Sequence, residues 1–289
     1  MIKKTLLFSL ATASLFALDK CAVDFADLIQ KNIQTRYAKN AKVKANVIET
    51  FKVDKDWKGE ILSISVTLDG QTLPPRKQII FCNEKKGLIA PILIKDKKDL
   101  SEEKLKEIKK EEIKKTLKNK KPLIKGKNGT VIVFTDPMCP YCRKFLPIVI
   151  QTAKDRGDTL YLIEIQLPYH KYSDRYEAAM IYAKERLKEK YPAFVAAVYS
   201  RVDFRGQNYE EDTVKGIFKD YNLSYSDFKK KENEYIQKAK NDFKENYKIF
   251  SSLGIKGTPT IINGAGEKVD MSDYLGKKTF EKVLNDGRK

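Results

Sequence analysis

The chain has 289 residues, of which 42% are hydrophobic and 33% charged, which excludes wholesale disorder and a polytopic membrane protein and leaves room for two domains. Lysine and arginine number 57 against 39 aspartate and glutamate, and the formal net charge of +18 by itself permits a nucleic-acid or membrane partner. The single histidine, His170, excludes a histidine-rich metal site and allows a Ser-His-Asp relay only if that residue serves it.

The first residues have the pattern of a secretory signal peptide. A cationic start, Met1–Lys4, precedes an apolar run over Thr5–Phe16, and Ala17 offers a cleavage site, with Ala13 as the alternative. The run is shorter than the roughly 20 apolar residues of a transmembrane span. We therefore predict that residues 1–17 are removed on export.

Export changes the interpretation of the charge and of the cysteines. The mature chain stays basic, but little nucleic acid exists outside the cytoplasm, so we expect a solvated, lysine-rich surface and no nucleic-acid partner. An oxidising compartment favours thiol-disulfide chemistry for the four cysteines before metal binding. A lipid anchor on Cys21 is disfavoured because that processing needs a small preceding residue, and Lys20 stands there.

Residues 18–94 are predicted to form a small α+β domain. Apolar residues recur at helical spacing over 21–37, and Glu60–Asp69 alternates between apolar and polar side chains, as a half-buried strand does. The other strands are expected at Lys42–Val53, Gln78–Cys82 and Gly87–Ile94. A domain of about 75 residues is near the size at which a core is only marginally sufficient, which leaves room for a stabilising partner.

Residues 95–127 are rich in lysine and poor in apolar residues and are predicted to be a charged helical linker. Ser101 is the expected N-cap, acidic residues fill the first turn, and Pro122 stops the helix. The apolar residues of this segment hold no single stripe, so we expect a solvated, rigid spacer between two modules.

Residues 128–289 are predicted to form the second domain. A buried strand over Thr130–Thr135, a helix from about Tyr141 to Lys154 and a strand over Thr159–Gln166 make a βαβ unit with a parallel pair. Residues 174–250 are expected to be mostly helical. The chain is expected to close with a hairpin of Thr260–Asn263 and Lys268–Met271 and a helix over Lys277–Leu284.

The motif Cys139-Pro140-Tyr141-Cys142 lies between the first of these strands and the helix. Two intervening residues allow one disulfide to close across the first turn of a helix, and the helix N-terminus stabilises a thiolate at Cys139. We therefore predict that Cys139 is the nucleophile, with a pKa clearly below the ~8.5 of a free thiol, and that Cys142 is the shielded resolving thiol.

Two other interpretations of this motif are weaker. A zinc site would need a second cysteine pair at close spacing, whereas Cys21 and Cys82 stand far apart in the other domain. A purely structural disulfide across so short a loop would remove little entropy from the unfolded chain. We therefore expect redox chemistry and no metal.

The run Phe134–Cys142 and the segment Gly257–Thr260 resemble the periplasmic disulfide isomerase family of DsbC and DsbG, and Asp136-Pro137 and Pro140-Tyr141 are most similar to DsbG. The resemblance covers the mature chain in outline. It implies an N-terminal α+β, cystatin-like dimerisation domain, a linker helix and a C-terminal thioredoxin fold with a helical insertion. It also implies a homodimer in the periplasm, with both active sites facing a cleft.

The resemblance implies the rest of the site as well. Thr258 and a cis Pro259 would lie against the disulfide and bind an extended substrate segment through the backbone, together with Pro140 and Tyr141. No cofactor is implied. The implied partners are unfolded or wrongly disulfide-bonded exported proteins and a membrane redox protein, either a DsbD-like reductant or a DsbB-like oxidant.

The chain departs from the family at several positions. Cys21 and Cys82 lie in the N-terminal domain, where the family usually has no cysteines, and either pair as a structural disulfide or remain two free thiols. Val133 stands where thioredoxin and DsbA carry a buried carboxylate that assists proton transfer, so no such base is assigned. His170 is interpreted as a loop histidine near the active face and not as a catalyst.

The sequence thus predicts a thiol-disulfide oxidoreductase that isomerises or reduces wrong disulfides in exported proteins. A dimeric DsbA-like oxidase that introduces disulfides is the alternative, because the direction depends on the redox potential and on the membrane partner. A non-catalytic periplasmic chaperone that uses the cleft alone is a further alternative.

Overall fold

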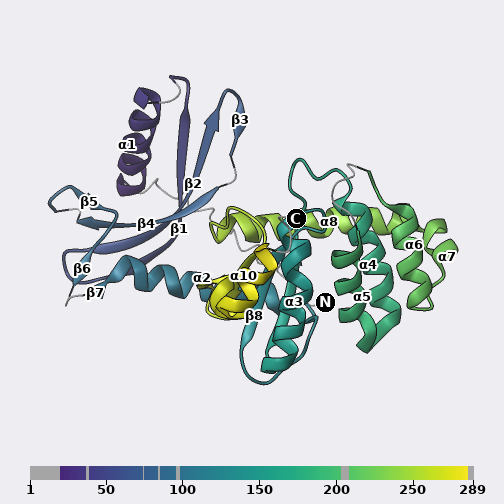
Figure 1. Ribbon diagram of the computed structural model, residues 1–289. Helices are drawn as coiled ribbons and strands as arrows, with labels where there is room; N and C mark the ends of the chain where they lie inside the picture. Colours follow the sequence, from purple (N-terminus) through teal and green to yellow (C-terminus); the bar gives the residue numbers. More distant parts are fainter. Residues whose placement is uncertain are drawn as a thin grey trace, which may run out of the picture. The chain divides into compact units, whose positions relative to one another are not determined.

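The structure, a computed structural model, describes residues 20–36, 39–73, 75–83, 85–95, 98–202 and 208–285. The chain forms two compact units, residues 1–101 and 102–289, and each is described by itself (Figure 1). The expected signal peptide, residues 1–17, lies outside the described residues. None of the helices in the described ranges combines the length and the apolar composition needed to cross a membrane.

The first unit packs one helix on an antiparallel sheet. Its elements are α1 (Lys20–Arg36), β1 (Lys42–Lys52), β2 (Lys58–Leu68), β3 (Gln71–Thr72), β4 (Arg76–Asn83), β5 (Leu88–Ala90), and the short strands β6 (Ile94–Lys95) and β7 (Lys98–Asp99). The sheet has the order β1-β2-β4-β5, with β3 paired to β2, while β6 and β7 pair with each other. The helix and strands confirm the predicted α+β class.

The core of the first unit lies between α1 and one face of this sheet. Ala22 and Phe25 of α1 pack against Leu62, Ile64 and Ile80 of the central strands. Leu62 and Ile64 are two residues apart on β2, so both side chains point to the same face of the sheet. The strict alternation in this strand is therefore the pattern that places α1.

The second unit is a four-stranded sheet with helices on both faces. Its elements are α2 (Leu100–Lys118), β8 (Thr130–Thr135), α3 (Pro140–Arg156), β9 (Thr159–Glu164), α4 (Ser173–Leu187), a 3₁₀ turn (Lys188–Lys190), α5 (Tyr191–Arg201), α6 (Glu211–Asp220), α7 (Tyr225–Lys230), α8 (Glu232–Ser252), β10 (Thr260–Asn263), β11 (Lys268–Val269), α9 (Met271–Leu275) and α10 (Lys277–Asn285). The strand order is β11-β10-β8-β9. The β8–β9 pair is parallel, as predicted, and β10 runs antiparallel to β8.

Strand β8 is buried on both faces, which explains its continuous apolar sequence. Val131 and Val133 belong to a large core that includes α3 and the helices α4 to α7. Ile132 and Phe134 face a second core on the other side of the sheet. The helices α4 to α8 fall between β9 and β10, where the helical insertion is predicted (Figure 1).

The expectation of a solvated spacer is wrong for the C-terminal half of α2. Ile113 is only 1% exposed and packs with Ile132 and Phe134 of β8, and Leu117 lies beside this cluster. The hydroxyl of Ser252 in α8 also donates to the Glu112 carboxylate at 3.1 Å. Two apolar residues at a spacing of four are enough to dock this half, even though the helix as a whole has no continuous apolar stripe.

Candidate redox site

The active-site motif occupies the turn between β8 and α3. Cys139 is the N-cap of α3, with an extended backbone (φ −72°, ψ 123°), and Pro140 is the first helical residue. Proline suits that position because its missing N–H would have no partner inside the helix and its φ is already helical. The Cys139 N–H donates to the Asp136 carbonyl at 3.0 Å, which closes the turn. The motif therefore holds Cys139 at the positive end of the helix dipole.

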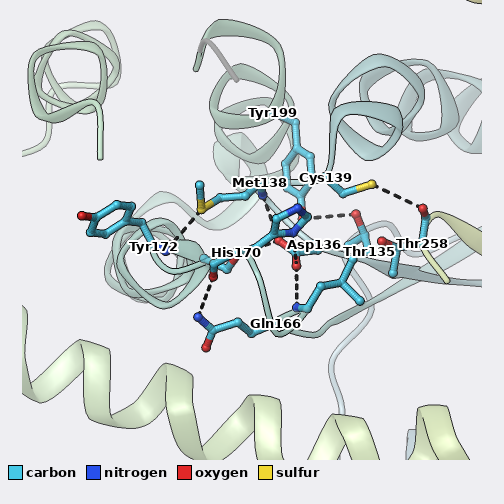
Figure 2. Close-up of polar contacts among 11 residues, drawn as sticks. Thr135, Asp136, Met138, Cys139, Gln166, His170, Tyr172, Tyr199 and Thr258 are labelled. Atoms are coloured by element: carbon cyan, nitrogen blue, oxygen red, sulfur yellow. Dashed lines mark hydrogen bonds and ion pairs between the residues drawn. The ribbon is translucent and has the colours of Figure 1, made fainter. Parts of the chain in front are cut away.

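The two thiols of the motif differ in exposure. Both are free cysteines, and Cys139 is 4% exposed whereas Cys142, one turn into the helix, is 0% exposed. The Cys139 thiol donates to the backbone carbonyl of Thr258 at 3.3 Å (Figure 2). Both residues are buried, and of the two only Cys139 keeps any exposed surface.

The two thiols also differ in acidity. The hydrogen bond from Cys142, the Thr258 side chain and the backbone N–H groups of Cys142 and Tyr141 lower the pKa of Cys139 to about 6, although burial opposes this. Burial, followed by the hydrogen bond to Cys139 and its negative charge, raises the pKa of Cys142 well above its usual range. The geometry therefore supplies one thiolate near neutral pH and keeps its neighbour protonated.

The segment before β10 completes the site from a distant part of the chain. The Thr258–Pro259 peptide bond is cis, as the resemblance implies. Thr258 and Pro259 are half-buried, and the contact with Cys139 joins residues 119 positions apart. On the helix side of the thiol, Tyr141 is 57% exposed. The expected substrate-binding residues thus include the half-buried Thr258 and Pro259 and an exposed aromatic ring.

Asp136, just before the motif, is a fully buried carboxylate that sequence reasoning did not assign to the site. It accepts hydrogen bonds from the backbone N–H of Met138 at 2.9 Å and of Leu167 at 2.8 Å. The Ser173 hydroxyl donates to it at 2.6 Å, and His170 Nδ1 lies 2.8 Å from its second oxygen. Figure 2 shows Asp136 at the centre of these contacts. The carboxylate joins the loop before Cys139 to the turn before α4.

His170 is therefore in a loop, as predicted, but it is buried and paired with Asp136. Its backbone carbonyl also accepts a hydrogen bond from the Gln166 side chain at 2.7 Å. The contacts of Asp136 span 31 to 37 residues of sequence beyond its own turn. No local sequence pattern connects residues at such separations, so the sequence gives no signal for the pairing of Asp136 with His170.

The remaining cysteines lie in the first unit. Cys21, at the start of α1, and Cys82, in β4, are joined as a disulfide with their Cα atoms 6.3 Å apart. Within the described ranges, no cluster of histidine, cysteine, aspartate or glutamate side chains is arranged to hold a metal ion.

Comparison with known proteins identifies the class of the second unit. Residues 127–286 match the family model described as Thioredoxin. The chain therefore belongs to the thioredoxin family, in agreement with the strand, Cys-x-x-Cys, helix arrangement and the cis-proline beside it. No curated protein sequence matches the chain.

Several solved structures are similar to the chain. The thiol-disulfide exchange protein alpha-DsbA2 from Wolbachia pipientis is 19% identical, with 61% of this chain and 97% of that chain covered and a TM-score of 0.49. BdbD from Bacillus subtilis is 17% identical, with 57% and 93% covered and a TM-score of 0.46. A periplasmic thioredoxin-like protein from Salmonella enterica serovar Typhimurium is 19% identical, with 60% and 96% covered and a TM-score of 0.44.

Proposed function

We propose that the protein is a thiol-disulfide oxidoreductase whose nucleophile is Cys139. The observation that carries this proposal is the contrast within one helical turn between a thiol with a pKa of about 6 and a fully buried one with a raised pKa. The thiolate is the form of cysteine that attacks disulfides, and Cys139 is mostly ionised near neutral pH.

The reaction follows from this arrangement. The Cys139 thiolate attacks one sulfur of a substrate disulfide, an S–S bond forms between enzyme and substrate, and the second substrate sulfur leaves as a thiolate. That thiolate can attack a different substrate sulfur, which rearranges the disulfides. Alternatively, Cys142 attacks Cys139, and the substrate is released with both of its cysteines reduced while the enzyme is oxidised.

Substrate binding is proposed around the Cys139 sulfur. The backbone of Thr258, next to the cis Pro259, would pair with an extended substrate segment, and such main-chain hydrogen bonds do not depend on side-chain identity. Pro140 and the exposed ring of Tyr141 would contact side chains of that segment. This mode suits an enzyme that acts on many different exported proteins.

Within this class we propose disulfide isomerase and reductase activity. The support is the resemblance of Phe134–Cys142 and Gly257–Thr260 to the DsbC and DsbG family. An isomerase must be kept reduced, so trapping the protein in its native compartment should find Cys139 and Cys142 as free thiols. A fully oxidised pair would contradict isomerase activity.

A second candidate is a DsbA-like oxidase, which would rest as the Cys139–Cys142 disulfide. The lowered pKa of Cys139 favours it, because a stabilised thiolate stabilises the reduced form and makes the disulfide a stronger oxidant. The reduction potential decides between the two functions: a potential close to that of a strong oxidant favours the oxidase.

We propose that the protein works in the periplasm, with residues 1–17 directing its export and then being removed. Its membrane partner would be a DsbD-like reductant or a DsbB-like oxidant. We also propose a homodimer formed through the first unit. Large apolar side chains are exposed there: Leu28, Val47, Ile48, Leu73, Leu88, Ile92 and Ile94. Light scattering should give twice the mass of one mature chain, and a monomeric mass would contradict the dimer.

Cys139→Ala provides the direct test of the enzymatic function. The variant should lose reshuffling of a scrambled, disulfide-rich substrate, because no other described cysteine has a comparable thiolate. Cys142→Ala is the matched control, since it keeps the attacking thiol and should accumulate mixed disulfides with substrate. Unchanged activity of Cys139→Ala would favour a non-catalytic chaperone.

A further inference from the structure

The buried thiol Cys142 poses a chemical problem that the proposed function leaves open, and any answer to it rests on that function. To attack the mixed disulfide, Cys142 must lose a proton although it is 0% exposed and burial raises its pKa. Cys139 cannot take this proton, since its sulfur is then bonded to the substrate. Val133, which points into the same core as Cys142, is apolar and offers no base.

A chain of buried hydroxyl groups leads away from Cys142 into the second unit. The Thr135 side chain, at the last residue of β8, lies beside the Cys142 thiol and lowers the pKa of Cys142, and its hydroxyl donates to the Tyr199 hydroxyl at 3.3 Å. Tyr199, in α5, in turn donates to Glu164 Oε1 at 3.1 Å. Figure 2 shows Tyr199 and Thr135 meeting beside Asp136. Thr135, Tyr199 and Cys142 are all fully buried.

The chain ends at a pair of buried carboxyl groups. Glu164, the last residue of β9, and Glu177 of α4 line the same cavity, and their carboxyl groups influence each other's pKa. Burial and the charge of Glu164 raise the pKa of Glu177 well above its usual range, and burial also raises the pKa of Glu164. Two adjacent carboxyl groups in such a site share one proton. The pair can therefore accept a proton through Tyr199 and release one on its other side.

A cavity connects this pair to solvent. Glu164 and Glu177 line a cavity of about 330 Å³ together with the half-buried Tyr191 and Lys120 and the exposed Lys184, Asp242 and Lys121. A cavity of this size and polarity holds several water molecules. Lys184 lowers the pKa of both carboxyl groups and Asp242 raises it. Protons can therefore leave the carboxyl pair through the water in this cavity.

We propose that Thr135, Tyr199 and the Glu164–Glu177 pair form a proton relay for Cys142. When Cys142 attacks, its S–H proton moves to Thr135, the Thr135 proton to Tyr199 and the Tyr199 proton to the carboxylate. The new S–S bond joins Cys142 to Cys139, the bond from Cys139 to the substrate breaks, and the substrate leaves as a thiolate. The two enzyme thiols are oxidised as the substrate disulfide is reduced, and the reverse reaction returns the proton to Cys142.

The direction of the hydrogen bonds supports this sequence of transfers. Thr135 donates to Tyr199 and Tyr199 donates to Glu164, so each oxygen towards Cys142 is free to accept the next proton. Burial, followed by the Glu164 charge, holds the pKa of Tyr199 well above its usual range. The tyrosine therefore passes the proton by exchange and does not become a stable phenolate.

The test measures the two chemical steps separately with oxidised glutathione as the substrate. The first step forms the mixed disulfide at Cys139, and the second releases glutathione as Cys142 attacks. Tyr199→Phe and Thr135→Val should slow the second step about a hundredfold, the low end of the contribution of general acid-base catalysis. Thr135→Ser, which keeps the hydroxyl, should restore the rate, and the first step should be unchanged in all three variants.

The pH dependence gives a readout that a structural role would not move. Without the relay, only the small fraction of Cys142 that is already a thiolate can attack. The rate of the second step should then rise about tenfold per pH unit, in proportion to that fraction. In the natural protein the dependence should be shallower, with loss of rate at low pH as the carboxyl pair becomes fully protonated. Glu164→Gln should show the steep dependence as well.

The matched control is Tyr182→Phe, another buried tyrosine, whose hydroxyl donates to the Ser224 carbonyl at 3.3 Å. It should resolve mixed disulfides at the natural rate. The relay is overturned if Thr135→Val and Tyr199→Phe also do so, if Tyr182→Phe is equally slow, or if Thr135→Ser is as slow as Thr135→Val. If Tyr199→Phe fails to fold, the two Thr135 variants decide. Failure of the natural protein to form any mixed disulfide would instead refute the proposed function.

Discussion

At the level of single residues, the reactivity of Cys139 depends on groups that the fold brings to its sulfur. The helix supplies the Cys142 thiol and backbone N–H groups, and a segment 119 residues away supplies the Thr258 side chain, all of which lower the pKa of Cys139. Asp136 stabilises the turn that presents this thiol, because its carbonyl accepts from the Cys139 N–H and its buried carboxylate accepts from the Met138 N–H. The position of the reactive sulfur therefore depends on a fully buried side chain just before the motif.

Asp136→Ala should destabilise the second unit by about 3 kcal/mol or more, because it leaves several buried hydrogen-bond donors unsatisfied at about 1–3 kcal/mol each. The loss leaves the N–H groups of Met138 and Leu167 and the ring of His170 without their acceptor. The loss of stability is measured by unfolding the protein in urea and using the alkylation of Cys142 to monitor the unfolded fraction. Asp155→Ala, which removes an exposed carboxylate from α3, should change stability by about 0.5 kcal/mol or less.

The cysteines of the site could be predicted from the sequence, whereas the pairing of Asp136 with His170 could not. Cys139 and Cys142 are found from local spacing, since the chemistry of the pair is set within one helical turn. Thr258 comes from a resemblance between motifs. The pairing of Asp136 with His170 joins residues 34 apart and is fixed only by tertiary packing, which leaves no periodic trace in the sequence.

At the level of elements, α2 belongs to the second unit through its C-terminal half. Its apolar residues form two groups: Ile113 and Leu117 dock on the sheet, whereas Leu105 and Ile108 take no part in the described cores. The high charge of the helix as a whole obscures the short apolar group of Ile113 and Leu117 in its sequence. The strands β8 and β9 and the helix α3 were predictable because each has a clear period or an uninterrupted apolar run.

Ile113→Ala should lower the free energy of unfolding of the second unit by about 2–5 kcal/mol, because it opens a cavity between α2 and the sheet. The control Ile108→Ala removes a half-buried side chain outside the described cores and should have a much smaller effect. Alkylation of Cys142 at increasing urea concentrations measures the stability of the second unit in both variants. Equal effects of the two substitutions would mean that α2 does not dock through Ile113.

At the level of the whole molecule, each unit is stabilised in its own way. The second unit has extensive cores on both faces of its sheet, whereas the first has a small core and a disulfide. A cross-link over a sequence separation of 61 residues confines the unfolded chain strongly. The disulfide therefore compensates for a domain near the lower limit of size.

Replacing both Cys21 and Cys82 with serine should cost the first unit about 4 kcal/mol, the entropic value for a loop of this length. Fluorescence of Trp57, the only tryptophan, follows unfolding of the first unit, and alkylation of Cys142 follows that of the second. Only the tryptophan signal should shift to lower urea concentration. An unshifted signal would show that the disulfide adds no stability.

The central claim is that Cys139 is an ionised, accessible nucleophile beside a protected thiol. Alkylation of the reduced protein over a range of pH, with Cys139→Ala and Cys142→Ala to assign the signals, tests it most directly. We predict one fast-reacting thiol, Cys139, whose rate rises with a midpoint near its pKa of about 6, and a slow Cys142. A midpoint for Cys139 near the ~8.5 of a free thiol, or equal rates for both thiols, would contradict this claim.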